Sequence, residues 1–327
     1  QGRLRYTPTV STCDPATEDC PVNPLAGSSS PTTVQLDQFW LNFDVGRTVF
    51  VTAGRQRIKW GSGRFWNPTD FLNQQALDPL AVFDERLGVD VLKVHMPVES
   101  LGWNLYAVAN LEGAQTPEQV GGAARAELLF GTTELALSAA ARKDTPLRLG
   151  ADVSAALWLF DVHVEGAVSH GVEDKFYEGD FDLGTLTFPR EVDRSDDWIA
   201  QVVAGAEVEV GYSNTDSLFL GAEYFFNDAG YDDAADLYPF LLFSSAFRFF
   251  YVGRHYTAAY ALLPGPGDWN DWTFTLSGLS NLSDRSVLAR ADIRVQVLTH
   301  LSVNTFASVH SGAKGEFRLG FDVPAVP

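Results

Sequence analysis

Residues 286–297 alternate between apolar and polar side chains along their whole length. One face has no charge and consists of Val287, Ala289, Ala291, Ile293, Val295 and Val297. The other face carries the charged residues Arg290, Asp292 and Arg294. Because successive side chains of a β-strand point to opposite faces, this period of two predicts a strand. The apolar face would form the core of a soluble sandwich, or would contact lipid in an outer-membrane barrel with a wet lumen.

The same alternation recurs in about sixteen segments, and we expect between about fourteen and eighteen strands. The predicted strands cover residues 2–8, 35–44, 48–60, 86–96, 101–111, 122–130, 134–142, 147–157, 160–168, 198–210, 218–226, 247–262, 272–279, 286–297, 301–309 and 315–323. We find no internal sequence repeat, which disfavours a propeller or a solenoid. The predicted fold class is therefore all-β, with residues 1–327 forming a single domain.

The connections between these segments differ in length in a regular way. Long polar loops follow odd-numbered strands, at residues 9–33, 61–85, 170–197 and 227–245, and the even-numbered connections are short. Outer-membrane barrels have this asymmetry, with long extracellular loops and short periplasmic turns, whereas a soluble sandwich has no reason for it. The pattern predicts a transmembrane antiparallel β-barrel of the bacterial outer membrane, with both termini at the periplasmic end.

The composition of the chain suits this prediction. Among its 327 residues, 13% are aromatic and only one is Met, which fits a β protein better than a helical core. No apolar run reaches the roughly 18 residues that a transmembrane helix needs, but barrel strands need no such run. Aromatic residues at predicted strand ends would form interface girdles, or alternatively a sandwich core: Trp198, Tyr212, Tyr224, Phe226, Trp269 and Trp272.

The formal net charge of −19 argues against nucleic-acid binding, which needs a basic surface. It is compatible with a bacterial surface protein or with a pore that favours cations. The polar face of the predicted strands would line one lumen with Arg125, Glu127, Arg148, Asp152, Asp161, Glu165, Glu207, Glu209, Arg290, Asp292, Arg294, Glu316 and Arg318.

Two cysteines, Cys13 and Cys20, lie in the polar loop 9–33. We interpret them as a disulfide that closes a small extracellular loop, which implies an oxidising compartment. Free thiols are the alternative, and zinc is disfavoured because no His or further Cys lies nearby. The sequence begins at Gln1 without a visible signal peptide, which we interpret as a processed or trimmed chain.

Four basic residues lie at the end of the third predicted strand and in the loop after it: Arg55, Arg57, Lys59 and Arg64. This basic stripe would attract anionic solutes into the pore. Alternatively, its side chains pair with lumen carboxylates such as Glu85, Glu127 or Glu165, because unpaired charges facing a narrow lumen are costly.

The loop 61–85 begins after Trp60 and contains Trp66, Asn67 and Asp70. Glycines at its start and the Asn67-Pro68 pair favour turns. We therefore consider two placements: the loop folds inward as a constriction, or it stays on the surface.

The segment Arg55-Gln-Arg-Ile-Lys-Trp-Gly-Ser-Gly-Arg-Phe-Trp-Asn-Pro-Thr-Asp70 resembles a motif of porin-like Gram-negative outer-membrane barrels, including alginate-export-like and related uncharacterised families. There, a strand ending in Gly-Arg-Gln and Trp-Gly leads into an Asn-Pro-x-Asp loop. The resemblance covers about residues 54–79 well and is diffuse elsewhere. It implies a barrel that passes or exports a solute, or that serves an envelope assembly.

Metal binding and catalysis have weak support. Four carboxylates in loop 227–245, on Asp228, Asp232, Asp233 and Asp236, are a calcium candidate, but their spacing does not match an EF-hand. Six scattered His residues accompany no GxSxG, HExxH, Walker or dinucleotide motif. We therefore predict no enzyme activity, no cofactor and no dedicated metal site.

These observations favour a passive channel for small polar or charged solutes. The alternative is a plugged barrel that anchors a larger export or surface complex, and a third hypothesis is a lipid-modifying barrel. The expected partners are lipid and lipopolysaccharide, small solutes, and other envelope proteins or further copies of the chain.

Overall fold

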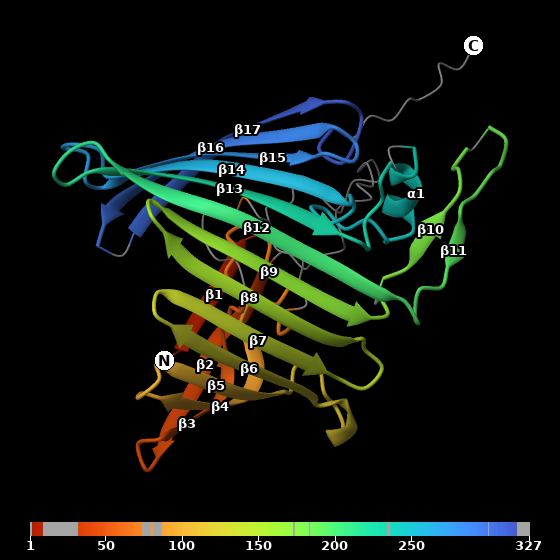
Figure 1. Ribbon diagram of the computed structural model, residues 1–327. Coiled ribbons are helices and arrows are strands. Elements are labelled where there is room, and N and C mark those ends of the chain that lie inside the picture. The colour runs from red at the N-terminus through yellow and green to blue at the C-terminus, as the bar shows by residue number, and fades with distance from the viewer. Residues whose placement is uncertain are drawn as a thin grey trace.

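The structure is a computed structural model that describes residues 2–8, 32–73, 80, 87–172, 174–182, 184–233, 236–299 and 301–318; for residues 2–8 and 32–36 only the backbone is described. Fifteen strands form one antiparallel sheet and pair in chain order, as Figure 1 shows. Two further short strands, β10 and β11, pair only with each other. Cys13, Cys20 and Glu85 lie outside the described residues.

The strands of the large sheet are β1 Gly2–Pro8, β2 Thr32–Val45, β3 Val49–Gln56, β4 Val89–Val98, β5 Trp103–Asn110, β6 Gly121–Phe130, β7 Thr133–Ala141, β8 Leu147–Leu157, β9 Phe160–His170, β12 Trp198–Gly211, β13 Ser217–Asn227, β14 His255–Pro264, β15 Trp272–Asn281, β16 Ser286–Leu298 and β17 Leu301–Gly312. The small hairpin consists of β10 Phe176–Glu178 and β11 Arg190–Val192. The helices are the short η1 Pro117–Gln119 and α1 Tyr238–Phe243. No helix among the described residues is long and apolar enough to span a membrane.

The all-β prediction is confirmed, and fifteen strands fall within the expected range. Three expected strands differ from the structure. β3 ends at Gln56 instead of residue 60, and β14 starts at His255 because residues 247–254 form turns. The strand expected at 315–323 is wrong over its described part, where a bridge between Gly315 and Arg318 closes a turn.

The sheet exposes its apolar face and buries its polar one. Large apolar side chains that are exposed on the outward face include Leu41, Leu92, Leu137, Leu149, Val153, Val164, Val202, Leu220 and Leu276. Buried polar side chains on the inward face include Arg125, Asp152, Glu165, Glu223, Ser277 and Asp292. A water-soluble protein rarely exposes so continuous an apolar surface, whereas lipid requires one.

The connections confirm the predicted difference between the two ends of the sheet. At the long-loop end, residues 57–88, 171–197 and 228–254 connect strands; at the short-turn end, the connections are as short as 46–48, 131–132 and 158–159. Because β17 is the fifteenth strand of the sheet, it ends at the long-loop end, where residues 313–318 continue. Both termini were expected at the short-turn end, and residues 1 and 319–327 lie outside the described part of the chain.

The long loops carry a small apolar lobe of their own. Helix α1 and the hairpin β10–β11 lie beside each other at the long-loop end (Figure 1). Their buried core contains Tyr177, Leu237, Tyr238, Leu241 and Val252. The Tyr238 hydroxyl donates to Asp284, 2.7 Å away, in the turn between β15 and β16. This hydrogen bond ties the lobe to the end of the sheet.

Candidate functional site: a loop folded into the lumen

The first part of the connection between β3 and β4, residues 57–73, folds against the inward face of the sheet, and we call it the inner loop. The Glu165 carboxylate on β9 accepts hydrogen bonds from the backbone N–H groups of Ser62 (3.0 Å), Gly63 (3.3 Å) and Thr69 (2.6 Å), and from the Thr69 hydroxyl (2.8 Å). Four donors satisfy a side chain with no exposed surface. One wall carboxylate therefore holds the loop at two places along its length.

A second carboxylate holds the middle of the inner loop. Glu223 on β13 accepts hydrogen bonds from the backbone N–H groups of Arg64 and Phe65, the latter at 2.9 Å. It also lies 3.1 Å from Nε2 of His163 on β9. Consecutive backbone N–H groups that converge on one anion form a nest, which favours negative charge. Glu223 was not among the predicted lumen residues, although its position on the inward face follows from the same period of two.

Aromatic packing anchors the loop on one side of the lumen. The Trp66 side chain is completely buried and stacks on Phe225, with ring centroids 5.2 Å apart. Its indole N–H donates to the carbonyl of Phe250 at 3.3 Å. On the opposite side, Thr69 fits where Gly150 on β8 leaves space: a Cβ at Gly150 would lie 2.6 Å from the Thr69 methyl group. The inner loop thus reaches from β8 to β13.

Two glycines allow the tight approach of the loop to its neighbours. Gly61 has a φ of +89°, and a Cβ there would lie 2.6 Å from both carboxylate oxygens of Glu165. A Cβ at Gly63 would lie 2.0 Å from the carbonyl oxygen of Trp66. At the base of the loop, Asp70 accepts a hydrogen bond from the Asn73 amide at 2.7 Å. The structure therefore places Trp60, Trp66, Asn67 and Asp70 in a segment inside the lumen.

The predicted basic stripe does not form, and this expectation needs correction. Arg55 is paired in the sheet with the exposed Phe39 and with Asp90, so it lies on the outward face. Its guanidinium contacts Asp90 at 2.7 Å and Glu112 at 3.0 Å. Because β3 ends at Gln56, the alternation that was expected to continue to residue 60 stops there.

The other three basic residues have separate environments. Arg57 contacts the buried Asp37 at 2.6 Å. Lys59 donates to the carbonyl of Gly63 at 3.1 Å. The guanidinium of Arg64 lies 3.8 Å above the ring of Tyr260. Among the described residues, Asp90 and Glu112 pair with Arg55, and Asp37 pairs with Arg57. Glu85, one of the expected partners, lies outside the described residues.

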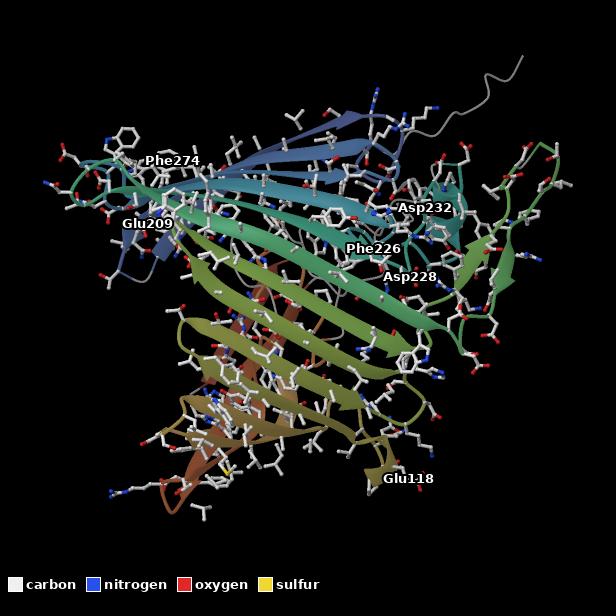
Figure 2. The ribbon with its side chains drawn as sticks, viewed as in Figure 1. Glu118, Glu209, Phe226, Asp228, Asp232 and Phe274 are labelled. Atoms are coloured by element: carbon white, nitrogen blue, oxygen red, sulfur yellow. The ribbon has the colours of Figure 1, made fainter. Side chains whose placement is uncertain are left out.

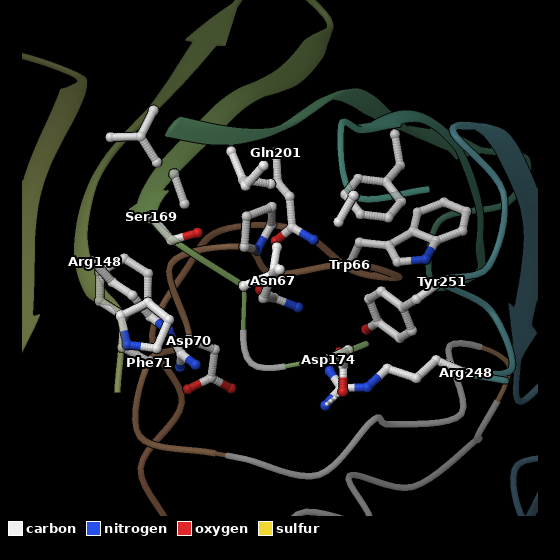
Figure 3. A pocket seen from close by; sticks show the side chains of 18 of the residues that line it. Trp66, Asn67, Asp70, Phe71, Arg148, Ser169, Asp174, Gln201, Arg248 and Tyr251 are labelled. Atoms are coloured by element: carbon white, nitrogen blue, oxygen red, sulfur yellow. Dashed lines mark ion pairs between the residues drawn. The ribbon is translucent and has the colours of Figure 1, made fainter. Parts of the chain in front are cut away.

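Two cavities lie on opposite sides of the inner loop. The long-loop cavity of about 210 Å³ is shown in Figure 3, and its lining includes Trp66, Asn67, Asp70, Arg148, Gln201 and Tyr251. An ion pair of 2.7 Å between Arg248 and Asp174 lies at its rim. The short-turn cavity of about 520 Å³ is lined by Ser62, Arg64, Asp161, His163, Glu207, Glu223 and Tyr260, among others. The inner loop separates these two spaces.

The predicted lumen residues of the strands lie on the inward face, with different partners. Arg125 bridges Asp152 (2.8 Å) and Glu127 (3.0 Å), and Arg290 contacts Asp292 at 2.9 Å. Glu209 lies at the short-turn end (Figure 2). Arg148 lines the long-loop cavity, and Asp161 and Glu207 line the short-turn cavity. Arg294 lies on β16, on the same face as Arg290 and Asp292.

Glu316 and Arg318 were expected on a lumen-facing strand, and this placement is wrong. Glu316 is buried at the long-loop end, where it accepts hydrogen bonds from the Tyr256 hydroxyl (2.8 Å) and the Asn281 amide (3.0 Å). Burial raises the pKa of its carboxyl to about 8. Arg318 is exposed and donates to the carbonyl of Gly312 at 2.6 Å. β17 ends at Gly312, so its inward-outward alternation does not extend to these two residues.

The acidic loop offers no metal site in the part of the chain that is described, where no group of three or more His, Cys, Asp or Glu is placed to hold an ion. Asp228 and Asp232 lie at the long-loop end (Figure 2). They contact Arg194 at 3.5 Å and Arg254 at 2.7 Å, respectively. Asp233 and Asp236 are exposed. Guanidinium groups therefore neutralise two of the four calcium candidates.

Comparison with known proteins supports the fold. No family model and no curated protein matches the chain. Among solved structures, it is similar to Wzi of Escherichia coli, described as an outer-membrane, carbohydrate-binding β-barrel involved in group 1 capsule assembly: TM-score 0.52, 11% identity, 85% of this chain and 67% of that one. It is also similar to OccK8 (OprE) of Pseudomonas aeruginosa, with TM-score 0.51, 9% identity, and 88% and 78% coverage.

The chain has the fold of the porin-like outer-membrane β-barrels. This confirms the predicted fold class and the general resemblance stated from residues 54–79. The more specific likeness to alginate-export-like families rests on those residues alone, because no family model matches.

Proposed function

We propose that the protein is a channel of the bacterial outer membrane, and that the inner loop narrows its lumen. The exposed apolar face of the sheet supports contact with lipid, and the long loops would then face the outside of the cell. Small polar or charged solutes would enter the long-loop cavity and leave through the short-turn cavity.

The observation that carries this proposal is the pair of wall carboxylates, Glu165 and Glu223, that hold the inner loop between two cavities. A plug of packed apolar side chains alone would not need such a polar attachment. Hydrogen bonds from backbone N–H groups of the inner loop to Glu165 and Glu223 fix the position of the loop. Polar side chains remain in the linings of both cavities, one on each side of the loop. This arrangement favours a narrowed, hydrated passage.

The test is single-channel recording of the purified protein in planar lipid bilayers. We expect discrete, small conductance steps in potassium chloride, together with liposome swelling in small polar solutes. A membrane that contains correctly folded protein and stays silent would contradict the proposal.

A second function, anchoring of a larger envelope complex, is favoured by the lobe at the long-loop end. Three apolar side chains there are well exposed: Leu186, Phe188 and Phe243. Wzi is described as taking part in capsule assembly, which is a related role for a similar fold. Stoichiometric co-purification of an envelope partner, lost in a Phe188→Ser and Phe243→Ser variant, would favour this function, especially with a silent bilayer.

A further inference from the structure

Two carboxylates face each other in the wall of the short-turn cavity. Asp161 on β9 and Glu207 on β12 are directly opposite in the antiparallel pairing, so their side chains share the inward face. Like charges in this position destabilise a sheet. Within the described residues, neither side chain forms an ion pair, and Arg64 acts on Glu207 only at longer range. The sheet therefore carries unneutralised negative charge at this point.

The rest of the cavity lining has the same sign. Besides this pair, Glu134 and Glu223 line the cavity, and Arg64 is the one Lys or Arg side chain of the lining within the described part of the chain. Four carboxylates against one guanidinium give the space a net negative charge. A low-dielectric wall focuses such a field and raises the local concentration of cations.

Two glycines, Gly205 and Gly221, leave the space in which the side chains of the cavity lie close together. A Cβ at Gly205 would lie 2.6 Å from both the His163 ring and Glu223, so this glycine lets them meet across β12. A Cβ at Gly221 would lie 2.3 Å from the ring of Tyr260. With a side chain at Gly205, His163 and Glu223 could not lie over β12, and with one at Gly221, Tyr260 could not lie over β13.

Three polar atoms of the cavity lining have no hydrogen-bond partner among the described residues. They are the hydroxyl oxygens of Ser62 and Tyr260 and Nε2 of His163, which lies 3.1 Å from Glu223 without forming a hydrogen bond. Tyr260 is only 7% exposed, and its ring already carries one cation, the Arg64 guanidinium. Buried polar atoms are nearly always satisfied in folded proteins, so a group of unsatisfied atoms at a cavity points to a ligand that supplies hydrogen bonds.

We infer that the short-turn cavity binds small aliphatic amines, with ammonium or guanidinium groups held by Asp161 and Glu207. A bare metal ion fits poorly, because no three His, Cys, Asp or Glu among the described residues converge on one point. Spread carboxylates instead match the separate N–H donors of an organic dication. The inward apolar side chains of Leu129 and Ala156 would contact its methylene chain. This inference rests on the proposed channel function, for which it specifies a class of solute.

The test is isothermal titration calorimetry on the full chain in detergent, with 1,4-diaminobutane and agmatine as probes. Succinate, a dianion of similar length, and neutral 1,4-butanediol are the matched compounds. We expect both amines to bind, with succinate and butanediol giving no binding heat. Binding of succinate as tight as that of the diamines would overturn the inference.

Charge variants make the test specific. Asp161→Asn and Glu207→Gln should each weaken diamine binding by about tenfold, the effect of losing one charged hydrogen bond. Arg64→Gln should tighten it, because a competing cation is removed. Glu209→Gln is the control: it changes the same charge on the same face of β12, but Glu209 does not line the cavity. Unchanged affinity in both carboxylate variants, or weaker binding in Arg64→Gln, would contradict the site.

Calorimetry does not depend on ion flow, so the two proposals can fail separately. Diamine binding to a protein that is silent in bilayers would refute the channel and leave the site intact. Conductance without diamine binding would refute the site and leave the channel.

Discussion

At the scale of single residues, the inward carboxylates differ in what neutralises them. Asp152 has a guanidinium, from Arg125, and Glu165 has the N–H groups of the inner loop. Asp161 and Glu207 face each other and the short-turn cavity, with no ion pair within the described residues. An inward acidic residue with a partner contributes to structure, and one without a partner is available to a solute.

Removing one charge of the unneutralised pair should stabilise the barrel. Asp161→Asn relieves the repulsion of Glu207 and should raise the free energy of unfolding by about 0.2–1 kcal/mol. Urea titration of the protein refolded into lipid vesicles measures this change. Asp152→Asn serves as the opposite control, because it breaks an ion pair with Arg125 and should be destabilising. A loss of stability in Asp161→Asn would show that a cation already neutralises this carboxylate.

The period of two predicted which residues face inward, but it did not predict their partners. Asp152, Asp161 and Glu207 were placed correctly because strand alternation is local. Their partners depend on register across several strands, which no single strand encodes. The prediction of a basic stripe was wrong for a related reason, because it extended the alternation beyond Gln56, where β3 ends.

At the scale of elements, the inner loop is the feature with the largest functional consequence. Its glycines and the Asn67-Pro68 turn indicated a compact loop, and its inward placement was one of two sequence-based alternatives. The inward placement of the loop depends on Glu165 and Glu223, which are about a hundred residues or more away in the sequence. Nothing in the spacing of residues 60–73 identifies these two carboxylates.

In the aromatic segment 247–262, composition predicted more strand than the structure contains. Its composition favoured one long strand, yet only the part from His255 onward joins the sheet. Phe247 packs against Tyr238 of α1, with ring centroids 5.6 Å apart, and Phe250 packs against Phe317. Aromatic residues suit a strand and a small apolar core equally well, so composition alone could not separate the two.

At the scale of the whole molecule, the arrangement of apolar side chains defines the environment. The sheet turns its apolar residues outward and its charges inward, and its loops are long at one end only. Both patterns were visible in the sequence, because alternation and loop length need no tertiary information. Sequence and structure therefore agree on the exposed apolar face of the sheet.

A charge placed on that face should destabilise the folded barrel in lipid. Val164 lies on the outward face in the middle of β9 and is 53% exposed. Val164→Arg should cost about 2–4 kcal/mol of folding free energy if the residue contacts hydrocarbon. The matched control is Thr215→Arg, in the exposed turn between β12 and β13, which should change stability little. Equal effects of both variants in vesicle-refolding titrations would argue against contact with lipid at this face.

The most direct measurement is single-channel conductance of the protein with and without the inner loop. The first variant replaces residues 62–69 with two glycines, and the control variant trims residues 180–187 in the hairpin outside the lumen. If the inner loop narrows an aqueous lumen, the first variant conducts severalfold more than the unmodified chain, and the control conducts the same. Equal conductance in all three proteins would contradict a constriction at Glu165 and Glu223.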